Sequence, residues 1–330
     1  MKKRILSGMR PTGPLHLGHL VGALSNWVKL QDEYECFYMV ADWHALMSEY
    51  EDPKDIKNNS LNCVIDWLSV GLDPEKCAIF VQSEVPGHLE LSMALACLTP
   101  LSWLERCPTY KEQLREITKR DLTTYAFLGY PVLQAADILV YRAQTVPVGI
   151  DQSSHLELTR EIARKFNSLY GEYFPEPQTL LTESPKLLGI DGRKMSKSYG
   201  NFISLSDSAD EVNAKVRKMF TDPKKIHKND KGHPDKCVVC SYYKIFAKDI
   251  AEDLPAKCMR GDVGCVECKK KLADILSETL GPVQGKRAAL LNDKAAVLDV
   301  IKKGREKAMA VASETMRHVR KRIGFYDGTA

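Results

Sequence analysis

Apolar residues in the first 200 positions form two kinds of pattern. Four short apolar runs predict buried strands, at 5–6, 36–41, 78–81 and 146–149. Four segments have apolar positions at helical spacing, at 20–27, 53–70, 110–141 and 155–170. Strands that alternate with helices predict a parallel sheet joined by right-handed crossovers. The fold class expected for this part of the chain is therefore α/β.

The pattern changes near residue 200. No further strand is predicted, and apolar residues at helical spacing from Ile301 to Ile323 predict one long helix. We therefore expect two domains: an α/β domain over residues 1–200 and an all-helical domain over residues 201–330.

The composition is that of an ordinary globular protein. The 330 residues are 44% hydrophobic and 27% charged, which allows a large domain and a smaller one with packed cores. After the basic residues 2–4, only Ile5 and Leu6 precede a polar residue, which is too short for a signal peptide. No apolar run approaches the roughly 18–20 residues that cross a bilayer. These features predict a soluble, cytoplasmic protein with no membrane partner.

The net charge of +4 is unevenly distributed. Between Lys302 and Arg322 the chain has eight Lys or Arg against Glu306 and Glu314, so this segment carries +6 and the rest −2. A basic end on a near-neutral body favours a polyanionic partner at that end. A solvated helix face is the alternative.

Residues 11–19, Pro-Thr-Gly-Pro-Leu-His-Leu-Gly-His, follow the first predicted strand and precede a helix. Ligands of open parallel sheets bind at the carboxyl ends of strands, where helix N-termini present free N–H groups to anions. Gly13 allows a sharp turn, and Gly18 lets a ring or phosphate approach the backbone. His16 and His19 could then donate hydrogen bonds to phosphate. The alternatives are an exposed turn or a His-x-x-His metal site, which has no acidic partner nearby.

A second polar motif, Arg-Lys-Met-Ser-Lys-Ser-Tyr-Gly-Asn, occupies residues 193–201. Its two lysines, Lys194 and Lys197, lie among small hydroxyl residues and predict a mobile cationic loop, called here the lysine loop (194–198). Such a loop suits stabilisation of a pyrophosphate leaving group, because negative charge develops there in the transition state. A lone charged loop would usually be exposed surface, but the first motif in the same domain favours the catalytic interpretation.

Together the motifs resemble the two signatures of the class I aminoacyl-tRNA synthetases, His-Leu-Gly-His at 16–19 and Lys-Met-Ser-Lys-Ser at 194–198. The resemblance implies a Rossmann-like catalytic domain and a two-step reaction that uses ATP with Mg²⁺. An amino acid and ATP give an aminoacyl-adenylate and pyrophosphate, and the acyl group then passes to tRNA. The amino-acid carboxylate attacks the α-phosphate, so the protein contributes positioning and electrostatics.

The resemblance also assigns roles to residues. The implied catalytic residues are Lys194, Lys197, His19 and Lys111. The implied ATP-binding residues are Arg10, Pro11, Thr12, His16, Gly18, His19, Gly149, Ile150, Asp151, Lys194, Met195, Ser196, Lys197 and Ser198. Arg10 departs from the pattern, since many relatives have glutamine there, and an arginine would contact phosphate or carboxylate more strongly.

Longer matches narrow the resemblance. Residues 130–139 and 146–152 are similar to the tyrosyl and tryptophanyl subgroup, and residues 7–13, 41–45 and 104–111 favour its bacterial tryptophanyl members. The implied function is activation of L-tryptophan and its transfer to tRNA(Trp) by a homodimer, with a tyrosyl enzyme as the alternative. A related nucleotidyltransferase would have little use for the basic helical end. The intact lysines disfavour a degenerate RNA-binding module.

The pocket implied by the resemblance centres on Asp137, which would accept the indole N–H. Indole is only a donor, so a fixed carboxylate distinguishes tryptophan from phenylalanine, and less cleanly from tyrosine, whose hydroxyl also donates. The residues expected to bind tryptophan are Leu6, His44, Gln134, Asp137, Val146, Val148 and Gln152. A helix-surface carboxylate is the alternative for Asp137, which its apolar neighbours in sequence disfavour.

Five of the ten cysteines fall between residues 237 and 268. Four thiolates suit a tetrahedral zinc ion or a [4Fe–4S] cluster, and reduced, packed cysteines are the alternative. The run Gly-Cys-Val-Glu-Cys-Lys-Lys at 264–270 resembles that of the bacterial tryptophanyl enzymes that carry a [4Fe–4S] cluster. The ligands implied are Cys237, Cys258, Cys265 and Cys268, with Cys240 as a rival for the first position.

Overall fold

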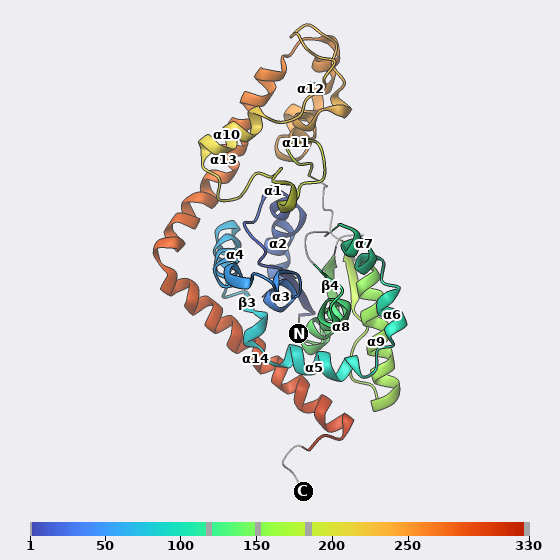
Figure 1. Cartoon of the computed structure of the whole chain (residues 1–330). Helices are drawn as coiled ribbons and strands as arrows, with labels where there is room; N and C mark the ends of the chain where they lie inside the picture. Colours follow the sequence, from blue (N-terminus) through green and yellow to red (C-terminus); the bar gives the residue numbers. More distant parts are fainter. Residues whose placement is uncertain (1, 117–120, 149–152, 182–186, 327–330) are drawn as a thin grey trace.

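The computed structural model describes residues 2–116, 121–148, 153–181 and 187–326. Its described strands form one parallel sheet in the order β3-β2-β1-β4-β5 (Figure 1). The strands are β1 (Arg4–Met9), β2 (Glu35–Val40), β3 (Cys77–Val81), β4 (Thr145–Val148) and β5 (Gln178–Leu181). The four predicted strands are confirmed as β1 to β4, and with them the α/β class. The sequence did not predict β5.

Helices connect the strands and cover both faces of the sheet. The α/β part contains α1 (Leu17–His19), α2 (Ser25–Glu33), α3 (Asp42–Glu49), α4 (Ile56–Val70), α5 (Gly87–Ala96), α6 (Leu101–Glu105), α7 (Pro108–Glu116), α8 (Tyr125–Val140) and α9 (Ser153–Tyr170). Shorter turns are η1 (Leu20–Leu24), η2 (Pro53–Asp55), η3 (Gln82–Glu84), η5 (Lys197–Tyr199) and η6 (Pro234–Lys236). After residue 200 come α10 (Ala209–Arg217), α11 (Val238–Phe246), α12 (Lys248–Arg260), α13 (Cys265–Asn292) and α14 (Lys294–Ile323). The described residues beyond 200 add no strand to the sheet, as predicted.

Successive strand side chains enter two apolar cores, one on each face of the sheet. In β1, Ile5 belongs to the core that includes α4, α10, α11 and α13, whereas Leu6 belongs to the core with α5, α8 and α9. Tyr38 and Phe37 of β2 divide in the same way. Burial on both faces explains why the strand sequences are continuous apolar runs.

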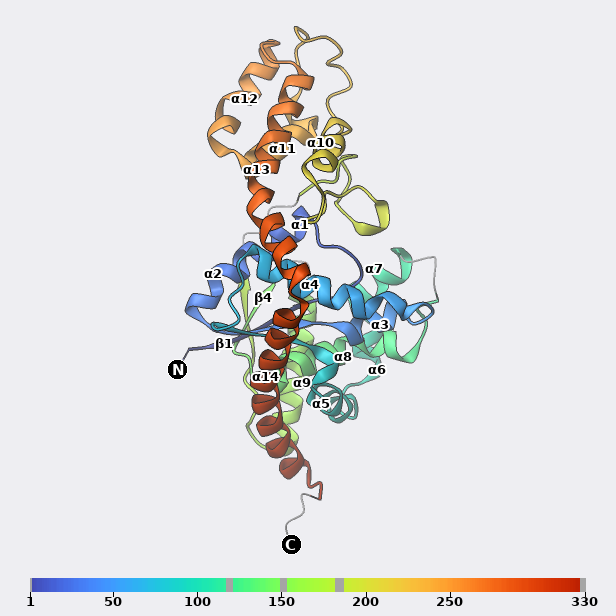
Figure 2. The same ribbon diagram turned by 90° about the vertical axis from the view of Figure 1, so that its left-hand side faces the viewer.

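The last helix, α14, crosses the edge strand β3 (Figure 1) and continues past α8 toward the C-terminus (Figure 2). Its first turns contribute Val297 to one core, and its later turns contribute Met316 to the other. Gly304 lies at the crossing, where an added Cβ would be 1.9 Å from the carbonyl oxygen of Ile79. Only glycine permits this approach, and the helix thereby covers an otherwise open sheet edge.

Helices α10 to α13 form a lobe above the sheet, and α13 extends from it toward the α/β part (Figure 1). Arg287 of α13 forms an ion pair with Asp66 of α4, with an N–O distance of 2.8 Å, and also contacts Asn62. The segment after residue 200 therefore divides between this lobe and α14, which packs on the sheet. The domain boundary near residue 200 stays a prediction. Among the described residues, no helix is long and apolar enough to span a membrane.

Candidate active site

The first motif leaves the carboxyl end of β1 and enters α1. His16 precedes α1 in an extended conformation, and its backbone N–H donates to Nδ1 of His19 at 3.1 Å. The N–H of Leu17 donates to the carbonyl oxygen of Ile203 at 3.0 Å. This hydrogen bond links the first motif to Ile203, just after the second motif.

Lys197 of the lysine loop lies against the first motif. Its Nζ donates to the carbonyl oxygen of Gly13 at 2.9 Å, across 184 positions of sequence. Gly13 has a φ of +118°, a conformation that favours glycine. An added Cβ on Gly18 would lie 2.9 Å from Nδ1 of His16 and 3.4 Å from the sulfur of Met195. The structure therefore brings the two motifs into direct contact.

Asn201 holds the backbone of the lysine loop. Its buried side chain accepts a hydrogen bond from the N–H of Ser196 at 2.9 Å and donates to the carbonyl oxygen of Lys194 at 3.1 Å. It also donates to the Asp191 carboxylate at 2.8 Å. The side chain of Lys194 is exposed, whereas Lys197 is half-buried against the first motif. The two lysines thus occupy different environments.

The titratable groups of the two motifs are partly dehydrated. Burial, together with the Lys197 ammonium, lowers the pKa of His16 to about 4. Burial, the His16 ring and Lys197 lower the pKa of His19 well below 6.5. Burial also lowers the pKa of Lys197 from 10.5. At neutral pH the two imidazoles are therefore uncharged, and the positive charge at this site comes from Lys197 and the nearby Arg10.

A cavity of about 370 Å³ opens beside the first motif, where β1, β2 and β4 end. Its volume is within the range of small-molecule sites, which lie at the carboxyl ends of parallel strands. Of the residues predicted to bind tryptophan, Leu6, His44, Gln134, Asp137 and Val146 line it. Arg10, predicted to bind ATP, also lines it. Sequence reasoning thus located one wall of a real cavity.

Other predicted residues are not placed at this cavity. Gly149, Ile150, Asp151 and Gln152 lie outside the described residues, and the side chains of Val148 and Ser198 are also not described. Lys111 lies on α7 with an exposed side chain and is not among the described residues that line the cavity. Its catalytic role stays a prediction.

Asp137 is a buried acceptor, 2% exposed, at the wall of the cavity. Its Oδ2 accepts from Nε2 of His44 at 2.8 Å. Its Oδ1 accepts from Nε2 of Gln82 and Nδ1 of His88, both at 2.7 Å. Burial raises the pKa of this carboxyl, but the hydrogen bonds from His44 and His88 and their electrostatic attraction outweigh burial and hold the pKa at about 2. Asp137 is therefore an ionised acceptor, and the helix-surface alternative is wrong.

Several residues of the site escaped the sequence analysis. Gln82 follows β3 directly, so the rule that sites lie where parallel strands end could have found it. His88 lies in an apolar helix, and its link to Asp137 spans 49 positions, which no local pattern reveals. Tyr130 and His155 also line the cavity, with the hydroxyl 2.8 Å from Nε2. Tyr130 opens the run 130–139 that the sequence analysis singled out, whereas His155 carries no motif of its own.

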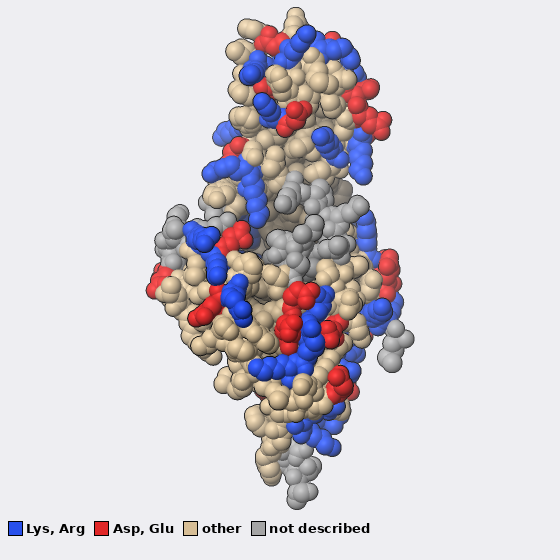
Figure 3. Space-filling model, turned by 90° about the vertical axis from the view of Figure 1, so that its right-hand side faces the viewer, with Lys and Arg blue, Asp and Glu red and all other residues tan. Residues whose placement is uncertain are grey.

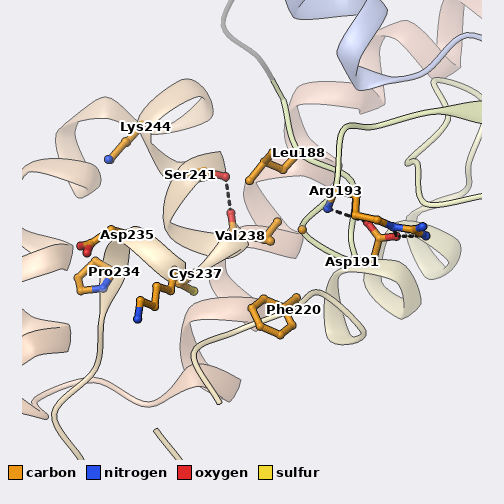
Figure 4. A pocket seen from close by; sticks show the side chains of 12 residues that line it. Leu188, Asp191, Arg193, Phe220, Pro234, Asp235, Cys237, Val238, Ser241 and Lys244 are labelled. Carbon is orange, nitrogen blue, oxygen red and sulfur yellow. Dashed lines mark hydrogen bonds and ion pairs between the residues drawn. The ribbon is translucent and has the colours of Figure 1, made fainter. Parts of the chain in front are cut away.

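A second cavity, of about 380 Å³, lies between the base of the lysine loop and α11, and Cys237 is among the residues that line it (Figure 4). Asp191 and Arg193, which form an ion pair, lie on one side, and Val238 and Ser241 of α11 lie on the other. The hydroxyl of Tyr242, also in α11, donates to the carbonyl oxygen of Leu188 at 2.8 Å. The helix that follows Cys237 is therefore fastened to the segment that leads into the lysine loop.

The five clustered cysteines surround one small cavity of about 20 Å³. The thiols that line it are those of Cys237, Cys240, Cys258, Cys265 and Cys268. A hydrogen bond with the Cys240 thiol lowers the pKa of Cys237 to about 6, whereas burial raises the pKa of Cys268 to about 12. Among the described residues, no three His, Cys, Asp or Glu side chains are arranged to hold a metal ion. The structure thus brings the predicted ligands together without displaying a coordination geometry.

Cations of the basic segment 302–322 partly contact the chain itself. Arg320 forms two hydrogen bonds with the Glu90 carboxylate, the longer 2.7 Å. The guanidinium of Arg322 lies 4.5 Å above the ring of Tyr173. On the face shown in Figure 3, Lys and Arg are interleaved with Asp and Glu. Part of the predicted polyanion-binding charge therefore fastens α14 to the α/β part.

Comparisons with known proteins agree with this geometry. The family described as tRNA synthetases class I (W and Y) matches residues 1–281. The tryptophan–tRNA ligase of Thermotoga maritima is 51% identical, over 96% of this chain and 98% of that protein. The tryptophan–tRNA ligase of Aquifex aeolicus is 44% identical over the same shares. A crystal structure of tryptophanyl-tRNA synthetase from Campylobacter jejuni, complexed with ADP and tryptophan, matches with a TM-score of 0.88 at 31% identity, over 98% of this chain and all of that one.

Proposed function

The chain belongs to the family of class I tRNA synthetases for tryptophan and tyrosine, and on that premise we propose that the cavity beside Asp137 is its tryptophan site. The enzyme uses ATP to convert L-tryptophan to tryptophanyl-adenylate and pyrophosphate, and then transfers the tryptophanyl group to tRNA(Trp). The observation that supports the site is a buried, ionised Asp137 in a cavity beside the docked lysine loop. Its carboxylate would accept the indole N–H.

The proposed roles of the nucleotide-site residues follow from their environments. ATP would lie along residues 10–19, with Mg²⁺ arriving on its phosphates. His16 and His19 are neutral, so they would position phosphate oxygens by hydrogen bonding. Lys194 and Lys197 would stabilise the charge that develops on the leaving pyrophosphate. The protein needs no nucleophile, because the tryptophan carboxylate attacks the α-phosphate.

Pyrophosphate exchange with single amino acids tests the substrate assignment. We expect exchange with tryptophan and at least about 10²-fold less with tyrosine at equal concentration. Tyrosine is the second candidate, because its hydroxyl is also a donor that Asp137 could accept. Exchange supported by tyrosine and not by tryptophan would reverse the assignment.

We also propose that the clustered cysteines hold a thiolate-bound metal centre, a [4Fe–4S] cluster with structural zinc as the alternative. The donor set fits either group, since Cys237, Cys258, Cys265 and Cys268 line one cavity with Cys240 as a fifth thiol. Lys225, 7% exposed, lines the same cavity, and its positive charge would offset the charge of anionic thiolates. The centre would tie α11, α12 and α13 together.

Anaerobic purification distinguishes the two metals. For a [4Fe–4S] cluster we expect a broad absorbance near about 400 nm and about four iron and four sulfide per chain. Replacing Cys268 with serine is expected to abolish this absorbance, whereas replacing the exposed Cys97 with serine should not change it. Stoichiometric zinc without this absorbance would select the alternative.

Charge and apolar exposure support two further proposals about partners. We propose that the anticodon of tRNA(Trp) docks on the lobe of α10 to α13, where Lys224, Lys228 and Lys231 are exposed in the loop before α11.

We further propose a homodimer. Met93 of α5 and Leu101 of α6 are 63% and 62% exposed, which is unusual for apolar side chains and typical of interfaces.

A further inference from the structure

A buried hydrogen-bond chain lies behind Asp137. Nδ1 of His88 is 2.7 Å from Oδ1 of Asp137, and Nε2 of His88 is 2.8 Å from the hydroxyl oxygen of Tyr141. His88 and Tyr141 are both 0% exposed, and neither is among the described residues that line the cavity. The chain therefore reaches the cavity only through Asp137.

The ionised Asp137 carboxylate requires a proton on Nδ1 of His88, because a carboxylate can only accept a hydrogen bond. Burial raises the pKa of Tyr141 well above 10, so its hydroxyl keeps its proton. In the tautomer with its proton on Nδ1, Nε2 is an acceptor, and the Tyr141 hydroxyl lies where it can donate to it. Nδ1 then donates to Asp137. The opposite tautomer would place a lone pair against the carboxylate.

Gln82 donates to the same oxygen but is held less firmly than His88. Its Oε1 has no hydrogen-bond partner in the part of the chain that the structure describes, so Asp137 alone orients its amide. His88 is fixed at both ring nitrogens. Oδ1 has these two donors, whereas among the described residues Oδ2 has His44 alone, so Oδ2 retains acceptor capacity beside a residue that lines the cavity.

We infer that His88, held at Nε2 by the Tyr141 hydroxyl, is a positioning residue that fixes the Asp137 carboxylate for recognition of the indole N–H. Four separate elements meet at this carboxylate: α3 through His44, η3 through Gln82, α5 through His88 and α8 through Asp137 itself. A carboxylate held from behind cannot rotate to follow a misplaced donor. This inference rests on the proposed role of Asp137 as the indole acceptor.

The test compares tryptophan with β-(benzothiophen-3-yl)alanine, in which sulfur replaces the indole N–H. Pyrophosphate exchange gives kcat/KM for each amino acid, and their ratio measures recognition of the N–H. We expect a ratio of about 10 to 100 in the unchanged enzyme, as for a hydrogen bond to a charged group. Tyr141→Phe is expected to lower the ratio about 3–10-fold and His88→Leu about tenfold or more, through KM for tryptophan rather than KM for ATP.

Two further variants separate positioning from folding. His88→Asn should keep the ratio within about threefold of the unchanged enzyme, because its amide N–H can replace Nδ1–H. Tyr38→Phe is the matched control, since it also removes a buried hydroxyl. That hydroxyl donates to the carbonyl oxygen of Trp27 at 2.9 Å, and Tyr38 belongs to the other apolar core from Tyr141. The ratio of Tyr38→Phe should not change. Thermal unfolding identifies any variant that fails to fold, and Tyr141→Phe keeps the ring that stacks on Phe37.

The outcomes distinguish the inference from its premise. An unchanged ratio in folded Tyr141→Phe and His88→Leu would overturn the positioning role, as would equal losses with both amino acids. A ratio near one in the unchanged enzyme would instead refute Asp137 as the indole acceptor, and with it the proposed tryptophan site.

Discussion

Replacing Lys197 with methionine is expected to lower kcat for tryptophan-dependent pyrophosphate exchange by about 10²–10³-fold, the usual cost of removing one group that stabilises transition-state charge. Methionine keeps the length of the apolar stem and removes only the ammonium. Because burial lowers the pKa of Lys197, the ammonium is disfavoured in the free enzyme. The melting temperature of this variant should therefore be unchanged or raised while activity falls.

Lys29→Met is the matched control for this variant. Lys29 is exposed on α2, and its replacement should leave kcat within about twofold. Exchange kinetics and thermal unfolding are measured on both proteins. Normal kcat in Lys197→Met would remove Lys197 from catalysis. Its hydrogen bond to the carbonyl oxygen of Gly13 would then have a structural role.

The sequence predicted those parts of the fold that depend on local patterns. Strands β1 to β4 are apolar runs buried on both faces, and each was found. Strand β5 was missed because Gln178–Leu181 has only four residues, two of them polar, and follows Pro177. Its strand conformation depends on pairing with β4, from Thr145 to Val148, more than 30 positions earlier. Such long-range pairing is not encoded in local periodicity.

The candidate site was likewise predictable where it depends on local sequence runs, and not where it depends on contacts between distant residues. The two motifs and Asp137 occur in recognisable runs, and the structure brings the motifs together and places Asp137 in a cavity. The groups that hold Asp137 were not predictable, because Gln82 and His88 lie in separate elements and contact it only in the folded chain. The basic helix α14 shows the same limit, because its charge was visible in the sequence but the contact of Arg320 with Glu90 was not.

Asp137→Asn is expected to lower kcat/KM for tryptophan by about 10²–10³-fold. An amide has one acceptor oxygen where the carboxylate has two. If that oxygen faces Gln82 and His88, an NH₂ group faces His44 and the indole N–H, so donor opposes donor. The loss should appear mainly in KM for tryptophan, because the ATP site along residues 10–19 is unchanged.

The measurement is pyrophosphate exchange with varied tryptophan at saturating ATP, together with KM for ATP. In the unchanged enzyme, KM for tryptophan should not depend on Asp137 titration between about pH 5 and pH 8, because a carboxyl with a pKa of about 2 is ionised throughout that interval. The benzothiophene analogue has no N–H, so Asp137→Asn should lower kcat/KM for this analogue less than kcat/KM for tryptophan. Equal loss with both amino acids would mean that the substitution had reshaped the cavity, and that recognition of the indole N–H depends on another group.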